Sequence, residues 1–208
     1  MKKTINDIYR LKIRDAARAA QVLFLALKDD PKLRSMFPDE SSVKKEMPTL
    51  IEFLVNYNIR CGVGYATSKE LEGIALWQDT FTGFDPLQAM RSGFFNLIRV
   101  LSWRSISRLF MSYRKITKYQ KRVFPKRYMG LELLGVDPNH QKQGYAGMLL
   151  RFMLSDLDVK RLPCCLMTNT ETNIEIYEKY AFNKVGVCID EEANVRSYYM
   201  TRAPQGNP

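Results

Sequence analysis

The chain has 208 residues, of which 46% are hydrophobic, 26% charged and 12% aromatic, and this composition fits a globular protein with one sizeable core. It argues against a disordered, collagen-like or disulfide-stapled chain. No apolar run is long enough to span a bilayer, the N-terminus does not resemble a secretion signal, and the four cysteines lack zinc or disulfide spacing. We therefore expect a cytoplasmic protein with reduced thiols.

The formal net charge of +10 comes from one part of the chain. Residues 85–130 hold 11 basic residues and a single acid, Asp85, whereas the charges of the remaining residues balance. The basic residues are Arg91, Arg99, Arg104, Arg108, Arg114, Lys115, Lys118, Lys121, Arg122, Lys126 and Arg127. Such a segment is either a solvated helical face or an attractor of nucleic acid, a membrane surface or an anionic small molecule.

The first predicted elements are a strand and two helices. Residues 8–14 alternate between apolar and polar side chains, which predicts a short strand. Apolar residues at helical spacing follow over 16–27, and Asp15 precedes them as a candidate cap. The Asp29-Asp30-Pro31 run ends that helix, and a second helix is expected to begin near Ser42.

The middle of the chain predicts strands on either side of the basic segment. Two short strands are expected at about 62–67 and 71–78. Residues 86–122 then have the pattern of amphipathic helix, although two serines inside it argue against one unbroken helix. We expect a helical insert of about 86–124, followed by an almost continuously apolar strand at 128–136.

The last third of the chain alternates helices and strands. They are expected at 144–159 (helix), 163–168 (strand), 172–180 (helix), 184–189 and 195–201 (strands). A strand–helix–strand unit over 128–168 implies a parallel pair with a right-handed crossover. We predict a single mixed α/β domain of residues 1–203, with the insert between its third and fourth strands, and a loose tail at 204–208.

The loop between the strand ending at Val136 and the next helix carries the clearest chemical signal. Exposed N–H groups at the start of a helix, with the helix dipole behind them, form an anion site. Gly144 lets the backbone approach a ligand closely, Ala146 and Gly147 add little bulk, and Lys142 adds a positive charge. A pyrophosphate would fit, although the dinucleotide and Walker fingerprints are both absent, and a plain tight turn is the other interpretation.

Two motifs at matching separation resemble those of one superfamily. Gln141-x-x-Gly144-x-Ala146 matches the Gln/Arg-x-x-Gly-x-Gly/Ala signature of the GNAT superfamily of N-acetyltransferases. After the next strand, the run NIEIYEKYAF at 173–182 resembles the Asn-x-x-x-Tyr-Glu-Lys/Arg-x-Gly-Phe block of the same superfamily. The resemblance is strongest over 128–187.

This resemblance implies a mixed, splayed sheet flanked by helices, with acetyl-CoA entering between the strands at 130–136 and 164–168. Backbone N–H groups of the loop 141–147 would hold its pyrophosphate, and Asn173 would contact the pantetheine arm. The backbone near Val136 would bond pantetheine and polarise the thioester carbonyl. The implied cofactor-binding residues are Val136, Gln141, Lys142, Gln143, Gly144, Tyr145, Ala146, Gly147 and Asn173.

N-acetylation asks for a base and an acid. An amine of pKa about 10 must lose a proton before it attacks, and the leaving thiolate benefits from protonation. Tyr177 lies where family members often place that acid, and a packed aromatic is the alternative. Glu132 is the only acid in its apolar strand. Regular alternation would place its side chain on the same face as Leu134 and Val136. It is the candidate base and could accept the proton through a water molecule. A structural ion pair with Arg127 or another residue of the basic segment is the alternative.

The chain departs from the family pattern in ways that leave the base open. Relatives often carry a glutamate where Met167 stands, and an aromatic or histidine-bearing segment where this chain has Lys126-Arg127-Tyr128. Ala181 replaces the usual glycine before Phe182, and an alanine there must avoid or strain a left-handed conformation. His140 is the only histidine, so a multi-histidine metal site is excluded and no metal is expected.

We therefore expect an acetyl-CoA-dependent N-acetyltransferase that moves an acetyl group to a primary amine, of a small molecule, by direct attack in a ternary complex. The alternative is a non-catalytic acyl-CoA-binding or sensing module that docks a partner through the basic segment. A nucleic-acid or membrane-surface role for that segment ranks behind both, and its apolar residues could pair two copies into a homodimer. Trp77 and Trp103 are expected in the core, with a substrate pocket as the alternative.

Overall fold

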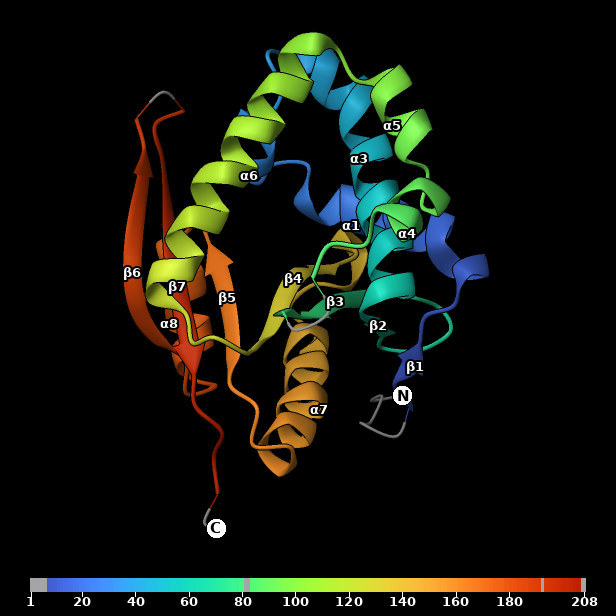
Figure 1. Cartoon of the computed structure of the whole chain (residues 1–208). Coiled ribbons are helices and arrows are strands. Elements are labelled where there is room, and N and C mark those ends of the chain that lie inside the picture. Colours follow the sequence, from blue (N-terminus) through green and yellow to red (C-terminus); the bar gives the residue numbers. More distant parts are fainter. Residues whose placement is uncertain (1–6, 81–82, 192, 207–208) are drawn as a thin grey trace.

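The computed structural model describes residues 7–80, 83–191 and 193–206. Across these residues the strands form one seven-stranded sheet in the order β1-β2-β3-β4-β5-β7-β6 (Figure 1). The strands are β1 (Tyr9–Arg10), β2 (Val63–Ala66), β3 (Gly73–Asp79), β4 (Met129–Val136), β5 (Cys164–Thr168), β6 (Asn183–Asp190) and β7 (Val195–Arg202). Within the sheet β4 and β5 are parallel and the other neighbours antiparallel, which confirms the predicted mixed sheet.

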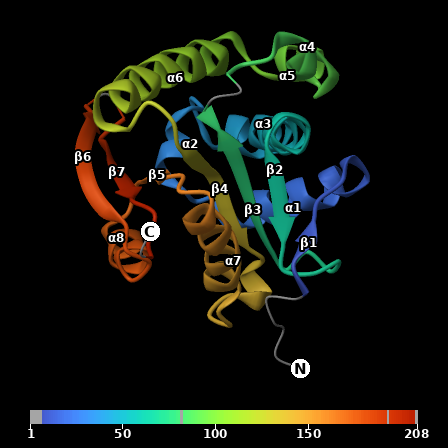
Figure 2. The ribbon, with the colours of Figure 1, turned by 60° about the horizontal axis from the view of Figure 1, so that its bottom comes forward.

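Helices cover both faces of this sheet (Figure 2). They are α1 (Ala16–Leu27), α2 (Pro31–Ser35), α3 (Glu40–Cys61), α4 (Pro86–Arg91), α5 (Phe94–Val100), α6 (Trp103–Val123), α7 (Tyr145–Val159) and α8 (Glu171–Glu178). On one face, α1 and α3 pack over the half that holds β2, β3 and β4, and the end of α6 covers β5 and β7. On the other face lie α7 and α8, with the buried side chains of Leu131, Leu150 and Met200.

The sheet is splayed between β4 and β5. The two strands pair over three residues each, from Met129 opposite Cys164 to Leu131 opposite Leu166. Beyond that point β4 continues along β3, and β5 continues along β7. In Figure 1, β3 and β4 consequently lie to the right of the opening, and β5, β6 and β7 lie to its left. The predicted splayed sheet is therefore confirmed.

A β-bulge in β4 lies at the point where the strands separate. Leu133 pairs with Leu76 on β3, whereas the next pair joins Leu131 to Trp77. Glu132 is consequently an extra residue with no partner on β3. A bulge of this kind bends its strand and increases the local twist, which explains why β4 turns away from β5 at this position.

The N-terminal expectation was partly wrong. Of the strand predicted at 8–14, only β1 forms, because the chain then curls into a 3-10 turn at Ile13–Asp15. The carboxylate of Asp15 accepts hydrogen bonds of 2.9 Å from the backbone N–H of Lys12 and from the hydroxyl of Tyr9. Asp15 therefore closes this turn and makes no side-chain cap on α1.

The helix α2 was not predicted, although its signal is present in the sequence. The carboxylate of Asp30 accepts hydrogen bonds of 2.9 Å from the backbone N–H groups of Lys32 and Leu33. Pro31 occupies the first helical position, where its missing N–H costs nothing. The Asp-Pro pair therefore ends one helix and begins the next.

The helical insert lies between the third and fourth strands, as predicted, but it consists of three helices. Gly93 takes φ of 99° between α4 and α5, and Ser102 caps α6 by accepting a hydrogen bond of 3.3 Å from the N–H of Ser105. In the tail predicted as loose, the N–H of Gln205 donates to Asp158 at 2.7 Å, and residues 207–208 lie outside the described part.

Candidate active site

The loop from Asp137 to Gly147 is exposed at residues 141–144 and has an unusual backbone. Lys142 has φ of 61° and Gly144 has φ of 84°, both in the left-handed region. A Cβ on Gly144 would meet nothing within 4 Å, so backbone conformation rather than space explains this glycine. The first backbone bond of the α7 ladder runs from the N–H of Met148 to the carbonyl of Gly144 at 3.0 Å, so the N–H groups of Tyr145, Ala146 and Gly147 precede that ladder. The loop thus presents a row of amides to solvent at the start of α7, where an anion is favoured.

The open edge of β4 runs up to this loop. The N–H of Asp137 donates to the carbonyl of Glu72 at 2.8 Å, which sets the alternation of the antiparallel ladder with β3. By that alternation, Leu134 and Val136 direct their backbone groups away from β3, toward the opening. The side-chain amide of Gln141 donates to the carbonyl of Val136 at 3.3 Å and so ties the loop to the open edge.

Glu132 lies on the bulge, and the bulge changes the face that its side chain occupies. A Cβ on Gly130 would lie 2.8 Å from the Glu132 Oε1, so the carboxylate lies over Gly130. Leu131 and Leu134 pack instead in the cluster on the α7 side. The prediction that Glu132 shares a face of the strand with Leu134 and Val136 is therefore wrong, because the extra residue interrupts the alternation.

The surroundings of Glu132 favour its neutral form. Part of the residue is exposed to solvent, and desolvation of its carboxylate, which lies over Gly130, raises its pKa. Tyr128 is its aromatic neighbour, and its own pKa is raised by burial, by Cys165 and by Glu132. In the described part of the chain Glu132 has no ion-pair partner, and Arg127 instead contacts Asp79 at 3.1 Å. The ion-pair alternative with Arg127 is therefore not realised.

Asn173 and Tyr177 both lie on α8, the helix that follows β5. The Asn173 side-chain amide donates to the hydroxyl of Thr168 at 3.1 Å, which holds it at the end of β5. The ring of Tyr177 packs on Phe182, with ring centroids 5.8 Å apart. Burial raises the pKa of the Tyr177 hydroxyl, with a smaller contribution from Cys164. Tyr177 packs in the cluster on the α7 and α8 side, near Cys164, so it lies on the face of the sheet opposite to Glu132.

Gly147 and Ala181 have packing and backbone roles between α7 and α8. A Cβ on Gly147 would clash with the hydroxyl of Tyr180, so a larger residue here would require the Tyr180 side chain to move. Ala181 has φ of 63°, in the left-handed region that favours glycine. The N–H of Phe182 donates to the carbonyl of Tyr177, and that of Ala181 to the carbonyl of Glu178. These two bonds form a Schellman motif that ends α8.

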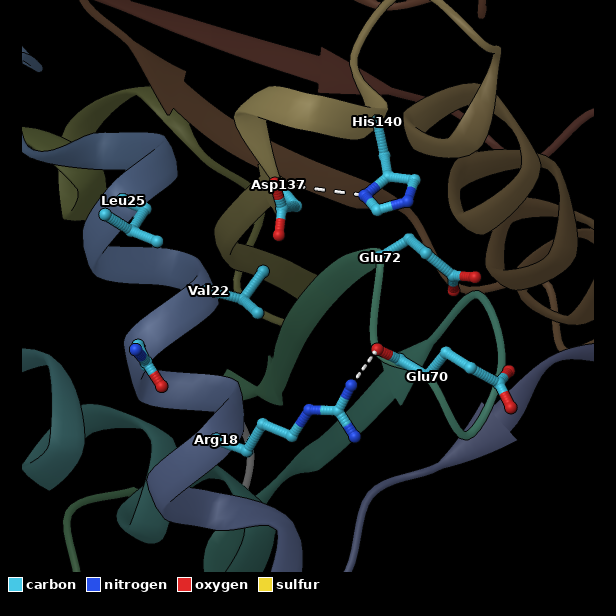
Figure 3. Close-up of a pocket in the computed structure, with 8 residues that line it drawn as sticks. Arg18, Val22, Leu25, Glu70, Glu72, Asp137 and His140 are labelled. Carbon is cyan, nitrogen blue, oxygen red and sulfur yellow. Dashed lines mark hydrogen bonds and ion pairs between the residues drawn. The ribbon is translucent and has the colours of Figure 1, made fainter.

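A cavity of about 380 Å³ adjoins the loop and was not predicted (Figure 3). Residues of α1 face residues of the β2–β3 turn and of the β4–α7 loop across it. They are Arg18, Gln21, Val22, Leu25, Glu70, Glu72, Asp137 and His140. Arg18 donates to the carbonyl of Glu70 at 2.9 Å, and the buried carboxylate of Glu72 accepts from the hydroxyls of Thr67 and Ser68. No sequence motif links these segments, because the fold alone brings them together.

The remaining candidates divide between core and surface. Trp77 is fully buried, as expected, whereas Trp103 is 80% exposed and the expectation that it belongs to the core was wrong. Cys164 and Cys165 are both buried, one on each face of the sheet, as their alternation predicts. Within the described residues, no group of three or more His, Cys, Asp or Glu side chains could hold a metal ion.

A mixed sheet that opens between two parallel strands, with an amide-rich loop at the end of the first, defines the GNAT acetyltransferase fold. Known structures agree with this assignment. The structure described as histone acetyltransferase HPA2 and related acetyltransferase, from Corynebacterium glutamicum, has a TM-score of 0.69 at 16% identity, over 100% of this chain and 99% of that one.

Two further structures are similar. Arylalkylamine N-acetyltransferase 2 from Aedes aegypti has a TM-score of 0.62 at 13% identity, over 95% of this chain and 98% of that one. A putative acetyltransferase of the GNAT family from Desulfovibrio desulfuricans has a TM-score of 0.55 at 13% identity, over 95% of this chain and 98% of that one. No family model and no curated protein matches the sequence. The chain therefore has the GNAT fold.

Proposed function

We propose that the chain transfers an acetyl group from acetyl-CoA to a primary amine of a small molecule, by direct attack in a ternary complex. The observation that carries this proposal is the opened edge of β4 together with the backbone amides at the start of α7, beside the exposed residues 141–144. One is an unpaired strand edge that a peptide-like arm could extend, and the other is an anion site at a helix start. The solved acetyltransferases with the same fold support the reaction class.

The chain's own groups fit acetyl-CoA in the proposed complex. The amides of 141–147 and the ammonium of Lys142 would bind the diphosphate. The backbone of Leu134 and Val136 would bond the amide groups of the pantetheine arm from one side, and Asn173 would contact it from the other. Acetyl-CoA supplies the activated acetyl group as a thioester. A backbone N–H at the open edge would stabilise the negative charge that develops on its carbonyl oxygen.

Glu132 and Tyr177 are the proposed acid–base pair. Desolvation raises the pKa of the Glu132 carboxylate, which moves it closer to neutral pH and makes it a better proton acceptor. Glu132 would take a proton from the ammonium group, directly or through a water. Burial keeps the Tyr177 hydroxyl protonated, so it could give a proton to the leaving thiolate from the opposite face. The placement on two faces lets each group act without contacting the other.

The proposed location is the cytoplasm. All four cysteines, Cys61, Cys164, Cys165 and Cys188, are free, which fits a reducing compartment. None of the described helices combines the length and hydrophobicity needed to cross a bilayer.

The Gly144→Glu variant tests the acetyl-CoA site. The new carboxylate would lie next to the backbone amides of the loop, where the diphosphate of acetyl-CoA is expected to bind. Repulsion between these negative charges should weaken acetyl-CoA binding, measured by calorimetry, by about a hundredfold or more. Gly83→Glu is the matched control, because Gly83 also has positive φ and open space around its Cβ position. Normal acetyl-CoA binding by Gly144→Glu would show that the site is elsewhere.

Turnover separates the proposed enzyme from a binding module. Thiol release from acetyl-CoA is measured across a panel of aliphatic and aromatic amines. The proposal expects release that depends on at least one amine. If the chain binds acetyl-CoA but no amine accelerates thiol release, the non-catalytic acyl-CoA-binding module is the better account.

A further inference from the structure

The three helices of the insert carry a large set of exposed apolar side chains. Trp103 is 80% exposed, Phe95 70% and Phe110 59%, values far from those of a packed core. The full set on the helices is Leu87, Met90, Phe94, Phe95, Ile98, Trp103, Phe110, Met111 and Tyr113, and Phe84 is exposed just before α4. Figures 1 and 2 both show α4, α5 and α6 as an outer layer of the molecule. We call the exposed side chains of these helices the insert surface. Its size and aromatic content mark a contact region.

The same surface carries the excess positive charge of the chain. Residues 86–127 contain no acid, and all eleven basic residues there are exposed. Arg108 donates to the carbonyl of Phe37, Lys115 pairs with Asp190, and Arg127 pairs with Asp79. Within the described residues, most of the others have no carboxylate partner: Arg91, Arg99, Arg114, Lys118, Lys121, Arg122 and Lys126.

The helix α6 packs on the core through the half-buried Ile106 and Leu109, and it also carries apolar side chains on an exposed face. Its buried residues are Ser105 and Ser112, whereas large apolar side chains point outward. Trp103, Phe110 and Arg114 follow one another at spacings of seven and four residues, so they share one outer stripe. The Arg114 guanidinium lies over the ring of Phe110, 5.7 Å from its centroid. Apolar bodies and cationic tips therefore alternate on the same exposed face.

We propose that the insert surface binds the surface of an anionic lipid bilayer. An interfacial helix has bulky apolar groups that enter the headgroup region and lysines and arginines that contact lipid phosphates. The long basic side chains can extend alongside the inserted rings and keep their charges at the phosphates. Two features of the insert surface favour a bilayer. Its basic side chains complement the charge of the lipid phosphates, and its apolar side chains can enter the headgroup region.

Two other occupants fit the surface less well. A nucleic acid would match the charge and could stack on aromatic rings, but it offers nothing to the exposed aliphatic side chains of Leu87, Met90 and Ile98. A second copy of the chain would place the same patch against itself. That arrangement would bring two uncompensated basic segments together, which like-charge repulsion opposes.

The test measures binding of the full chain to lipid vesicles by sedimentation. We expect binding to vesicles of phosphatidylcholine with phosphatidylglycerol, little binding to phosphatidylcholine alone, and weaker binding as salt rises. Absence of binding to the anionic vesicles at low salt would overturn the proposal. So would binding to an oligonucleotide but not to vesicles, or a dimer in solution that the aromatic substitutions below convert to monomer.

Two triple variants separate the apolar and cationic contributions. Phe95→Ser with Trp103→Ser and Phe110→Ser should weaken vesicle binding at least about tenfold. Arg114→Gln with Lys118→Gln and Lys121→Gln should weaken it on the order of a hundredfold and flatten the salt dependence.

Each variant has a matched control on another exposed part of the chain. Val185→Ser with Val187→Ser and Ile189→Ser removes exposed apolar groups from β6, and Lys69→Gln with Lys179→Gln and Lys184→Gln removes three other charges. Both controls should bind vesicles as the unaltered chain does. Thermal unfolding establishes that each variant is folded. Equal losses in variants and controls would contradict a specific role for the insert surface.

Discussion

At the scale of single residues, the β-bulge gives Glu132 its distinct environment. As the extra residue of β4, it has no partner on β3, and its carboxylate lies over Gly130 at the rim of the opening. A glutamate in regular alternation would instead lie against the apolar cluster under α7 with Leu134. Desolvation at the rim raises its pKa without an ion-pair partner among the described residues to lower it again. Such a carboxylate is costly for stability and suited to proton transfer.

The Glu132→Gln variant should lose activity and gain stability. Because a general base typically contributes about a hundredfold or more, turnover should fall by that order at neutral pH and recover partly as pH approaches the pKa of the amine. The raised pKa of Glu132 means that folding stability is largest below the unfolded pKa and falls as pH rises through the folded pKa. Glutamine has no such loss, so the variant should unfold at a higher temperature at neutral pH.

The measurements are turnover against pH and thermal unfolding at pH 4 and pH 7. Glu175→Gln, an exposed position on α8, serves as the control and should change neither. Unchanged turnover in Glu132→Gln at neutral pH would remove Glu132 from the proposed mechanism.

At the scale of elements, the turn after α8 explains what Ala181 does where the GNAT motif that residues 173–182 resemble has glycine. Its Schellman bonds place Ala181 in the left-handed position and bring Phe182 onto Tyr177, and the ring of Phe182 is almost fully buried. A glycine would meet the backbone requirement at this position without strain, whereas this chain has an alanine there. The same contact holds the ring of the proposed acid.

Ala181→Gly should stabilise the chain. Relief of the left-handed conformation is worth about 1–2 kcal/mol, and the added freedom of the unfolded glycine costs about 0.4–1 kcal/mol. The net gain should be about 0.5–1 kcal/mol in the free energy of unfolding by urea. Ala17→Gly, at an exposed position in α1, should instead lower the free energy of unfolding, by about 1 kcal/mol. A loss of stability in Ala181→Gly would contradict the strain argument.

At the scale of the whole molecule, one carboxylate joins three parts of the chain. Asp190 on β6 contacts the ammonium of Lys32 on α2 at 2.9 Å and that of Lys115 on α6 at 3.2 Å. Burial alone would raise the pKa of Asp190, but the two lysines outweigh it and the pKa is lowered. Lys32 is itself buried, so the pair connects the N-terminal helices to the C-terminal strands.

Asp190→Asn should therefore be strongly destabilising. It leaves the Lys32 ammonium buried without a counter-charge, which costs about 3 kcal/mol in the free energy of unfolding. Because the folded pKa of Asp190 is lowered, the stabilisation is present above the unfolded pKa and is lost as pH falls through the folded pKa. The difference between the variant and the unaltered chain should accordingly shrink in acid. Asp156→Asn, which breaks the exposed pair with Lys160, should change stability by no more than about 0.5 kcal/mol.

The sequence alone determined the features that depend on local pattern. Apolar periodicity placed most helices and strands within a few residues, and the strand–helix–strand unit required the parallel pair of β4 and β5. The motifs around Gly144 and Tyr177 indicated the fold, because each combines a backbone requirement with a nearby element boundary. Gly144 indeed has positive φ at the start of α7, and Tyr177 lies on α8, the helix that follows β5.

Other features were decided by tertiary structure. The bulge at Glu132 depends on register with β3, a strand more than fifty residues earlier, and periodicity within β4 cannot show it. The outward direction of Trp103 depends on which side of α6 meets the sheet, since an amphipathic pattern does not say whether its apolar stripe is buried. The ion pairs of Asp190 and the cavity beside Asp137 join segments that only the fold brings together. Long-range pairing and packing, rather than local propensity, determine these sites.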